Sequence, residues 1–451
     1  MRLKKYPLPK PGTLQFRKTL SIPALLQQVR ESFGSLPEHR SRKVQYPLPD
    51  VLMSAVAMFS LKDESLFAFD ERRNDEKRQA NLNSLYGIKK APCDTQMRSI
   101  LDKVDPQGLR PAFLSLHQAL QKQGVLESYR FLGKYLVSMD GTGLYSSGKI
   151  SCPDCCNKQH RNGDVSYYHQ LLGAVIVHPD KPTVLPLFPE AITHQDGTTK
   201  NDCEHNASGR LIPRIRQDFP RLEMIALQDA LACNGPHIKR LKAKKFSFII
   251  TSKPAANSLL LKTVVKGMLD GSTQEQETTD EAGIIRGYRF RNDVPLNNAH
   301  KDLLVNFIDY WEIHPNGKLF TYACVTDLAL TADNVAEVVL AGRARWKIEN
   351  ETFNTLKNQG YHLEHNYGHG EKHLSTVFAT LMMLTFLIDQ IQETCCAYFQ
   401  EVRHSYRARI RVWEQIRSYF NVHFVASWES LYAAMIWGEN PSVKPEWADT
   451  G

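Results

Sequence analysis

Residues 135–140 read Tyr-Leu-Val-Ser-Met-Asp, and residues 224–229 read Met-Ile-Ala-Leu-Gln-Asp. Each stretch is an apolar run of strand length that ends on an acidic residue and is followed by a break in the pattern. Ligands commonly bind where the strands of an open sheet end, because the loops there are free to shape a crevice. Either aspartate alone is typical of an ordinary turn. Together, Asp140 and Asp229 predict an acidic site at one edge of a sheet.

A third acidic residue, Glu349, lies in the apolar stripe of a predicted helix that spans 333–358. Apolar residues recur there at spacings of seven and three, which is one face of a helix: Val339, Trp346, Phe353 and Leu356. A buried carboxylate needs a cation or a metal as a partner. Arg345, four residues earlier, is one such partner and offers a purely structural explanation. The other explanation is a divalent-metal site, because clustered carboxylates hold Mg²⁺ in phosphodiester chemistry.

The bulk composition is that of an ordinary globular protein, with 42% hydrophobic and 23% charged residues. The net charge of +8 permits a polyanionic partner without requiring one. The longest apolar run, 377–388, is shorter than a membrane span and predicts a buried helix and no membrane association. Residues 1–20 lack the apolar core of a signal peptide, and the nine cysteines are clustered, so we expect a reducing, cytoplasmic location.

Changes in the pattern divide the chain into five segments. They are a helical segment, a strand-rich segment, a β-rich insertion, helices that carry Glu349, and a C-terminal helical region: 1–130, 131–253, 254–330, 331–395 and 396–451. Strands alternate with helices in the second segment, which predicts an α/β fold with a mixed sheet flanked by helices.

The first segment contains two clear helix signals. Asp50 is a candidate N-cap for a helix over 51–59, and a second helix is expected to open after 93–95 with its apolar residues on one face. Two interpretations of this helix pair stay open. The helices either pack into the protein core or form a module that binds the ends of a DNA element.

Cysteines and histidines gather in the strand-rich segment. Cys152 and Cys155 form a Cys-x2-Cys pair, and Cys203 and His205 follow, so these four side chains are candidate ligands of one structural Zn²⁺. Cys156 or His160 are alternative members of the set, and reduced thiols in a loop are the alternative to any metal. His169 and His194 are expected to be core or surface histidines. The stretches 195–197 and 200–204 carry further carboxylates that could approach the acidic site.

Three stretches resemble the signatures of one family, the bacterial insertion-sequence transposases with an aspartate-aspartate-glutamate (DDE) triad. They are 138–142, 227–230 and above all 345–350, which reads Arg-Trp-Lys-Ile-Glu-Asn and is followed by Phe353 and Lys357. The last is similar to the branch whose helix has an arginine, three intervening residues, the catalytic glutamate and a downstream lysine. Lys357 follows Glu349 by eight positions where that branch has seven, and Glu351 lies nearby.

The resemblance implies a ribonuclease H-like fold in which the long interval between Asp229 and Glu349 houses the β-rich insertion. It implies that Asp140, Asp229 and Glu349 are catalytic and bind two Mg²⁺ or Mn²⁺ ions. Water would free a 3′-hydroxyl at the end of the element, and this hydroxyl would attack target DNA.

The same resemblance implies DNA contacts and an assembly. Arg345 and Lys357 would bind phosphate, Trp311 in the insertion would stack on a flipped base, and a homodimer would join two transposon ends. Two alternatives stay open: a metal-dependent nuclease of the same fold without strand joining, and a catalytically silent, domesticated DNA-binding protein.

Overall fold

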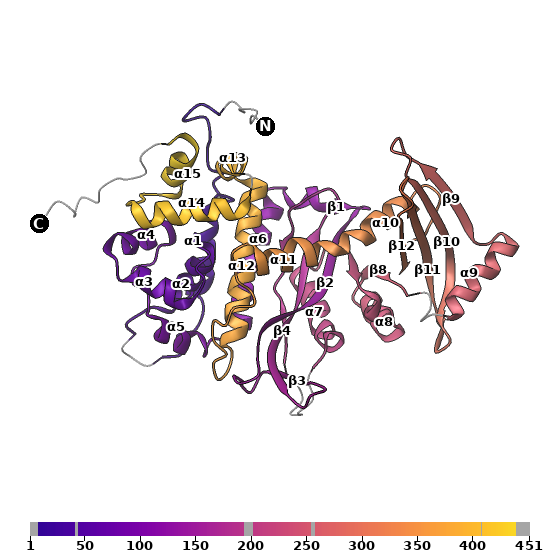
Figure 1. Ribbon diagram of the computed structural model, residues 1–451, viewed down its shortest axis with the longest axis horizontal. Helices are drawn as coiled ribbons and strands as arrows, with labels where there is room; N and C mark the ends of the chain where they lie inside the picture. The colour runs from indigo at the N-terminus through magenta and orange to yellow at the C-terminus, as the bar shows by residue number, and fades with distance from the viewer. Residues whose placement is uncertain (1–7, 41–43, 194–201, 254–257, 407, 439–451) are drawn as a thin grey trace, which may run out of the picture.

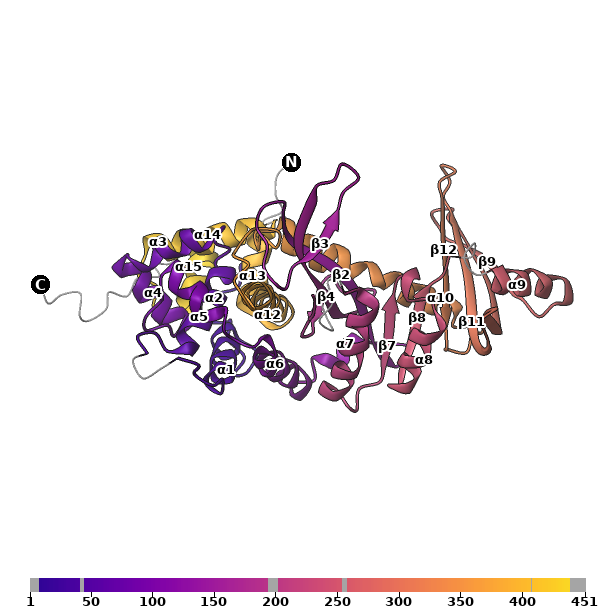
Figure 2. The same ribbon diagram turned by 90° about the horizontal axis from the view of Figure 1, so that it is seen from below.

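The computed structural model describes residues 8–40, 44–193, 202–253, 258–406 and 408–438. It is a mixed α/β structure built around one twelve-stranded sheet whose main path runs β3-β4-β2-β7-β8-β12-β11-β10-β9 (Figure 1). A helical body covers one end of the sheet, and the strands of the insertion form the other end (Figure 2). The predicted α/β class and mixed sheet are therefore confirmed.

The centre of the sheet consists of β2 (Lys134–Ser147), β4 (Val165–Val177), β7 (Met224–Gln228) and β8 (Phe246–Thr251). Strand β4 runs antiparallel to β2, whereas β7 runs parallel to β2 and β8 runs parallel to β7. This is the ribonuclease H-like arrangement that the resemblance implied. Every residue of β7 is buried, as expected for a parallel strand covered on both faces.

Short strands and helices complete this part of the chain. The strands are β1 (Arg130–Phe131), β3 (Cys156–Gln159), β5 (Leu185–Pro186) and β6 (Glu190–Ile192), and the helices are α7 (Glu204–Asp218) and α8 (Gly235–Ala243). Strand β5 pairs with β4 at only two positions, Leu185 opposite Ile176 and Pro186 opposite Val175.

The insertion extends the central sheet. It contains α9 (Ser258–Asp270), β9 (Gln274–Thr279), β10 (Ile285–Asn297), β11 (His300–Ile313) and β12 (Leu319–Thr326). Strand β12 pairs antiparallel with β8, with Cys324 opposite Thr251, so hydrogen bonding continues without a gap from the central strands into the insertion. Helix α9 was not anticipated from the sequence; it packs on β10 through Leu260 and Val264.

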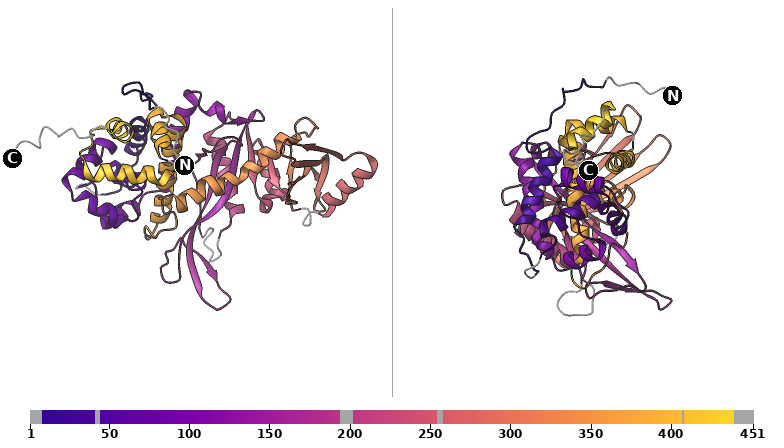
Figure 3. Two further views of the ribbon diagram at one scale, coloured as in Figure 1. Left: turned by 45° about the horizontal axis from the view of Figure 1, so that its top comes forward. Right: turned by 90° about the vertical axis from the view of Figure 1, so that its left-hand side faces the viewer.

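The helical body combines the two ends of the chain (Figure 3). Its N-terminal helices are α1 (Ile22–Gly34), α2 (Leu48–Ser60), α3 (Leu66–Arg73), α4 (Glu76–Tyr86), α5 (Asp94–Leu101) and α6 (Arg110–Lys122). Its C-terminal helices are α12 (Leu374–Cys395), α13 (Ala397–Ser405), α14 (Arg409–Val422) and α15 (Trp428–Trp437). The Asn81 side-chain amide on α4 donates to the carbonyl oxygens of Phe420 and His423, 2.8 and 2.7 Å away. These bonds connect segments that the sequence pattern treated separately.

Helix α12 is the core of this body. Among the described residues it is the one helix long and apolar enough to cross a membrane by length and composition, yet 89% of its apolar window is buried inside the protein. The run 377–388 is thus part of a buried helix, as predicted, and the helix extends beyond it at both ends.

One of the two N-terminal helix signals was misread. Asp50 is not the N-cap of α2; the helix begins two residues earlier, and the Asp50 carboxylate lies buried in the first turn. There it pairs with Arg30 and accepts the backbone N–H groups of Lys89 and Lys90 at 3.1 and 3.2 Å. Helix α5 is present but begins at Asp94, inside the stretch 93–95 after which it was expected to open, and its apolar face packs against α2 and α12.

A buried ion pair joins the end of α2 to α12. Lys62 has a fully buried side chain, and its Nζ lies 2.7 Å from Oδ2 of Asp389. The same ammonium lies over the rings of Tyr361 and Trp413, 3.9 and 4.1 Å from their centroids. Because both charges are removed from water, each depends on the other for its solvation.

We predict that Lys62→Met lowers the free energy of unfolding by about 3–5 kcal/mol, because it leaves the Asp389 carboxylate buried without a counterion. Lys239→Met is the matched control: Lys239 pairs with Asp302 at 3.1 Å on the surface, and its loss should cost less than about 1 kcal/mol. Urea unfolding followed by circular dichroism measures both. Equal losses in the two variants would contradict the structural role of the Lys62 pair.

Candidate active site

The strand register brings Asp140 and Asp229 together. Ser138 on β2 is paired with Leu227 on β7 in the parallel ladder. Asp140 lies two residues further along β2, and Asp229 directly follows the end of β7 at Gln228. Neighbouring strands are about 4.8 Å apart, so both aspartates belong to the same edge of the sheet. A cavity of about 590 Å³ is lined by both.

Glu349 approaches Asp140 from the helical layer. It lies in η6 (Ile348–Phe353), a π-helical turn in the helical stretch that continues through α10 (Val335–Arg343), η5 (Ala344–Trp346) and α11 (Asn354–Asn358). This stretch crosses the sheet toward α12 (Figure 1). A second cleft of about 400 Å³ is lined by Asp140, Glu349 and Lys357. Asp140 therefore belongs to both clefts, with Asp229 on one side and Glu349 on the other.

The π-helical turn accounts for the spacing of Lys357. In a π-helix the hydrogen bonds join residues i and i+5, so each bond encloses one more residue than the i to i+4 bond of an α-helix. The extra residue places Lys357, eight positions after Glu349, where a regular helix would place the seventh. Both side chains consequently line the same cleft.

Arg345 is the cation between two of the carboxylates. Its Nη1 lies 2.7 Å from Oε1 of Glu349 and 3.3 Å from Oδ2 of Asp140. The hydroxyl of Ser138 donates to the Arg345 carbonyl oxygen at 2.9 Å, so the arginine backbone is held by the strand that carries Asp140. The Arg345–Glu349 pair considered from the sequence is present, and it includes Asp140 as well.

Burial and like charge shape the ionisation of the site. Burial, together with a hydrogen bond that the protonated Asp140 carboxyl donates to Glu349, raises the pKa of Asp140 to about 7, although the Gly141 N–H and Arg345 act in the opposite direction. Burial also raises the pKa of Glu204, and the negative charge of Asp229 adds to that effect. A cation that binds among these carboxylates relieves both the burial cost and the repulsion.

Glu204 is a fourth carboxylate of the site, which the sequence grouped only as part of 200–204. It begins α7 and lines the same cavity as Asp140 and Asp229. Gln170 on β4 donates to its Oε1 at 3.2 Å. The predicted carboxylate stretch 195–197 and His194 lie outside the described residues.

The tryptophan expected to contact DNA, Trp311, lies on β11 in the insertion. It is half-buried, its indole packs across Gly287 on β10, and its Nε1 donates to Glu277 at 3.3 Å. Trp346, which the sequence placed only in an apolar stripe, is 49% exposed and lies beside Arg345. The sequence carries no signal for this exposure, because the residue has the spacing of a core position.

The zinc ligands expected from the sequence are only partly brought together. Cys152 and Cys155 lie side by side, but Cys203 is exposed and His205 packs against His237, and both line the cavity that holds Asp229. The proposed second pair is therefore corrected. Cys203 and His205 line that cavity because they lie at the start of α7.

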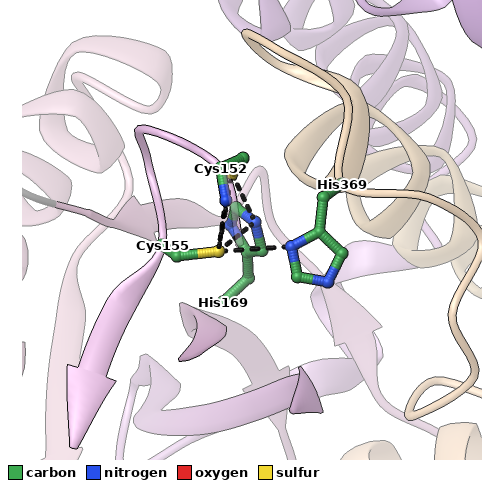
Figure 4. Close-up of side chains that lie close together, drawn as sticks. All are labelled: Cys152, Cys155, His169 and His369. Atoms are coloured by element: carbon green, nitrogen blue, oxygen red, sulfur yellow. Dashed lines mark hydrogen bonds between the residues drawn. The ribbon is translucent and has the colours of Figure 1, made fainter. Parts of the chain in front are cut away.

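Two histidines take the places of that pair. His169 on β4 and His369, in the segment between α11 and α12, form a cluster with Cys152 and Cys155 (Figure 4). His169 was expected to be a core or surface histidine, and His369 was not singled out.

No protein-family model matches the chain, and no curated protein matches it. One solved structure similar to this chain is a cryo-EM structure of a piggyBac transposase synaptic complex with hairpin DNA. It is 10% identical, covers 94% of this chain and 82% of that chain, and has a TM-score of 0.41. This likeness is too distant to assign a function.

The donor set of the site fits a hard divalent cation. Asp140, Asp229 and Glu349 offer carboxylate oxygens, which Mg²⁺ and Mn²⁺ prefer over nitrogen or sulfur. The two clefts that meet at Asp140 give one shared carboxylate flanked by two others. That arrangement can hold two ions that share Asp140.

Close packing against Gly173 fixes the helix beside the strand. Gly173 on β4 is paired with Asp140, and a Cβ atom built on it would lie 2.9 Å from Cζ of Phe353. We predict that Gly173→Val displaces Phe353 and lowers the free energy of unfolding by about 1–3 kcal/mol. Gly143→Ala, where nothing lies within 4 Å of the added atom, is the control and should change stability by less than about 1 kcal/mol. Denaturant unfolding measures the stability of both variants. An unchanged free energy of unfolding in Gly173→Val would contradict the close packing of Phe353 on Gly173.

Proposed function

We propose that this chain is a DDE transposase that cleaves DNA at the ends of an insertion sequence and transfers the freed 3′-hydroxyl into target DNA. One observation carries the proposal. Asp140 on β2 lines one cavity with Asp229, which directly follows the neighbouring strand β7, and it contacts the same guanidinium, that of Arg345, as Glu349 on the helical stretch that crosses the sheet. The resemblance of the sequence around the three residues to the DDE signature assigns them to this chemistry.

Asp140, Asp229 and Glu349 would hold two Mg²⁺ or Mn²⁺ ions, with Asp140 between the other two. When bound, such ions stabilise the charge on the attacking and leaving oxygens of an in-line phosphodiester displacement. In the hydrolytic step, water replaces the 3′-oxygen on phosphorus and leaves a 3′-hydroxyl. In strand transfer, that hydroxyl replaces a 3′-oxygen of the target, so the number of phosphodiester bonds is conserved.

Positive side chains in the proposal hold the DNA. Arg345 is buried beside the carboxylates, and its Nε has no hydrogen-bond partner among the residues the structure describes. This leaves a donor for a phosphate oxygen. Lys357 lines the cleft with Glu349 and is paired with Glu364 at 2.7 Å, a surface pair that a phosphate can replace.

Assembly and location follow from the same proposal. Joining two transposon ends requires two protomers on DNA, so we propose a homodimer in the bacterial cytoplasm, associated with the nucleoid when bound to DNA. A nuclease of the same fold would cleave without joining strands, and a domesticated protein would bind DNA without cleaving it.

The central test uses purified protein, Mg²⁺ and labelled DNA that carries the inverted repeats flanking its own gene. We expect Asp140→Asn, Asp229→Asn and Glu349→Gln each to lower the cleavage rate by about 10³-fold or more, because each removes a charge that stabilises the transition state. The substitutions preserve side-chain volume, so the fold is retained.

Glu351→Gln is the matched control, since Glu351 lies in the same π-helical turn and is the competing register for the third carboxylate. It should keep cleavage within a few-fold of wild type. Loss in Glu351→Gln and retention in Glu349→Gln would overturn the assignment of Glu349. Cleavage without joined products would identify the chain as a nuclease that does not join strands. Binding of the DNA with no cleavage at all would identify it as a catalytically silent DNA-binding protein.

DNA contacts are separable by salt dependence. We predict that Lys357→Gln reduces the slope of log binding constant against log salt by about 1, whereas Lys357→Arg preserves it. Trp311→Ala should weaken binding by about 1–3 kcal/mol with an unchanged slope, because base stacking releases no counterions. Fluorescence anisotropy over a range of salt concentrations measures both quantities. An unchanged slope in Lys357→Gln would remove Lys357 from the phosphate contacts.

A further inference from the structure

Four side chains of residue types that ligate metals, from three separate segments, converge in one cluster (Figure 4). Cys152 and Cys155 belong to the loop between β2 and β3, His169 to β4, and His369 to the segment between α11 and α12. Cys155 and both histidines are buried, and Cys152 is half-buried. Each contributes one ligand atom, and these atoms all lie within 4.8 Å of one another.

The distances are those of a compact tetrahedron. The two sulfur atoms are 3.5 Å apart, and Nε2 of His169 lies 3.2 and 3.4 Å from Sγ of Cys152 and Cys155. Nδ1 of His369 lies 3.2 Å from Sγ of Cys155. Four ligands at normal Zn–S and Zn–N bond lengths are about 3.4–3.8 Å apart, so little movement is needed to enclose an ion.

We propose that Cys152, Cys155, His169 and His369 bind one structural Zn²⁺. The site is distinct from the proposed catalytic centre in its chemistry, because thiolates and imidazoles favour zinc whereas the carboxylates favour Mg²⁺ or Mn²⁺. Four protein ligands leave no open position, which is the mark of a structural rather than a catalytic zinc site.

Local backbone geometry supports metal ligation over a disulfide. The sulfur atoms are well beyond the S–S bond length of about 2.05 Å. The Cys155 N–H donates to the Cys152 carbonyl oxygen at 3.1 Å, and the Cys152 N–H points at Sγ of Cys155 at 3.3 Å. This tight turn aims both sulfurs the same way, and an N–H donor stabilises a thiolate.

His369 is delivered by a firmly anchored segment. The flanking glycines, Gly368 and Gly370, have φ angles of +120° and +68°, which other residues adopt only with strain. The carboxylate of Asp102 then accepts the backbone N–H groups of residues 371–374 at 3.0–3.1 Å. Asp102 comes directly after α5, so the segment is tied to the helical body on one side and to the cluster on the other.

The metal would connect β4 to the segment between α11 and α12. His169 and Gly173 lie on the same face of β4, four residues and about 13 Å apart, and Gly173 is where Phe353 of the π-helical turn packs. His369 comes from the segment that follows that helical stretch. A zinc ion bound to both histidines would hold this segment against β4, the strand paired with the one that carries Asp140.

The test is the metal content of the full-length protein, kept reduced and purified without chelator, then incubated with Zn²⁺ and desalted. We expect about one zinc per chain by elemental analysis, and only a small fraction of that in Cys152→Ser/Cys155→Ser and in His369→Ala. Two matched controls, Cys203→Ser/His205→Ala and Cys156→Ser, should keep the full content. The first control carries the ligand pair favoured by sequence spacing.

Cobalt gives a readout that needs no variant. Co²⁺ added to the reduced, zinc-free wild type should produce the intense visible bands of tetrahedral coordination and thiolate-to-metal charge transfer. Zinc content near zero in wild type, absence of these bands, or loss of zinc only in Cys203→Ser/His205→Ala would overturn the proposal. Metal content is measured without DNA, so its outcome is independent of whether the chain cleaves or joins strands.

Discussion

The contact of Arg345 with Asp140 and Glu349 is the constraint on which the site depends. The two carboxylates contact one guanidinium and repel each other, and burial makes the charge of Asp140 harder to sustain. The guanidinium supplies the opposite charge, and its own backbone is tied to β2 by Ser138. The helix and the strand therefore meet through an electrostatic contact. A divalent cation held by Asp140 and Glu349 would compete with Arg345 for the same oxygens, and the arginine would then be available for a phosphate in the proposed function.

The packing of the helix explains how this contact is reached. Gly173 leaves room for Phe353 beside Asp140, and the π-helical turn adds a residue within the stretch that carries Glu349. π-Helical turns are rare and are found mainly at functional sites, because they rotate the following residues out of the regular register. Lys357 reaches the Glu349 cleft for that reason.

Local patterns predicted the strands, the helix and the two strand-end aspartates, because alternation and helical periodicity record which face of an element is buried. They failed where the partner was distant in the sequence. Cys152 and Cys155 were found by their spacing, but His369 is brought to them by the fold, so spacing selected Cys203 and His205 instead. The exposure of Trp346 also results from tertiary packing, as does the packing of the N-terminal and C-terminal helices into one body. Neither can be predicted from the local pattern of a single sequence.

Strand β4 lies next to both the carboxylates and the cysteine–histidine cluster, which differ in the metal that they favour. Strand β4 presents Gly173 beside the carboxylates and His169 to the thiolates, so the two sites share a rigid element although they differ in donor chemistry. A hard cation gains little from sulfur ligands, and zinc bound by four protein ligands has no open coordination position. Occupancy of one site by the other's metal is thereby disfavoured. Zinc bound at His369 would order the segment between α11 and α12, so the entropy of ordering this segment would be lost during folding and not when DNA binds.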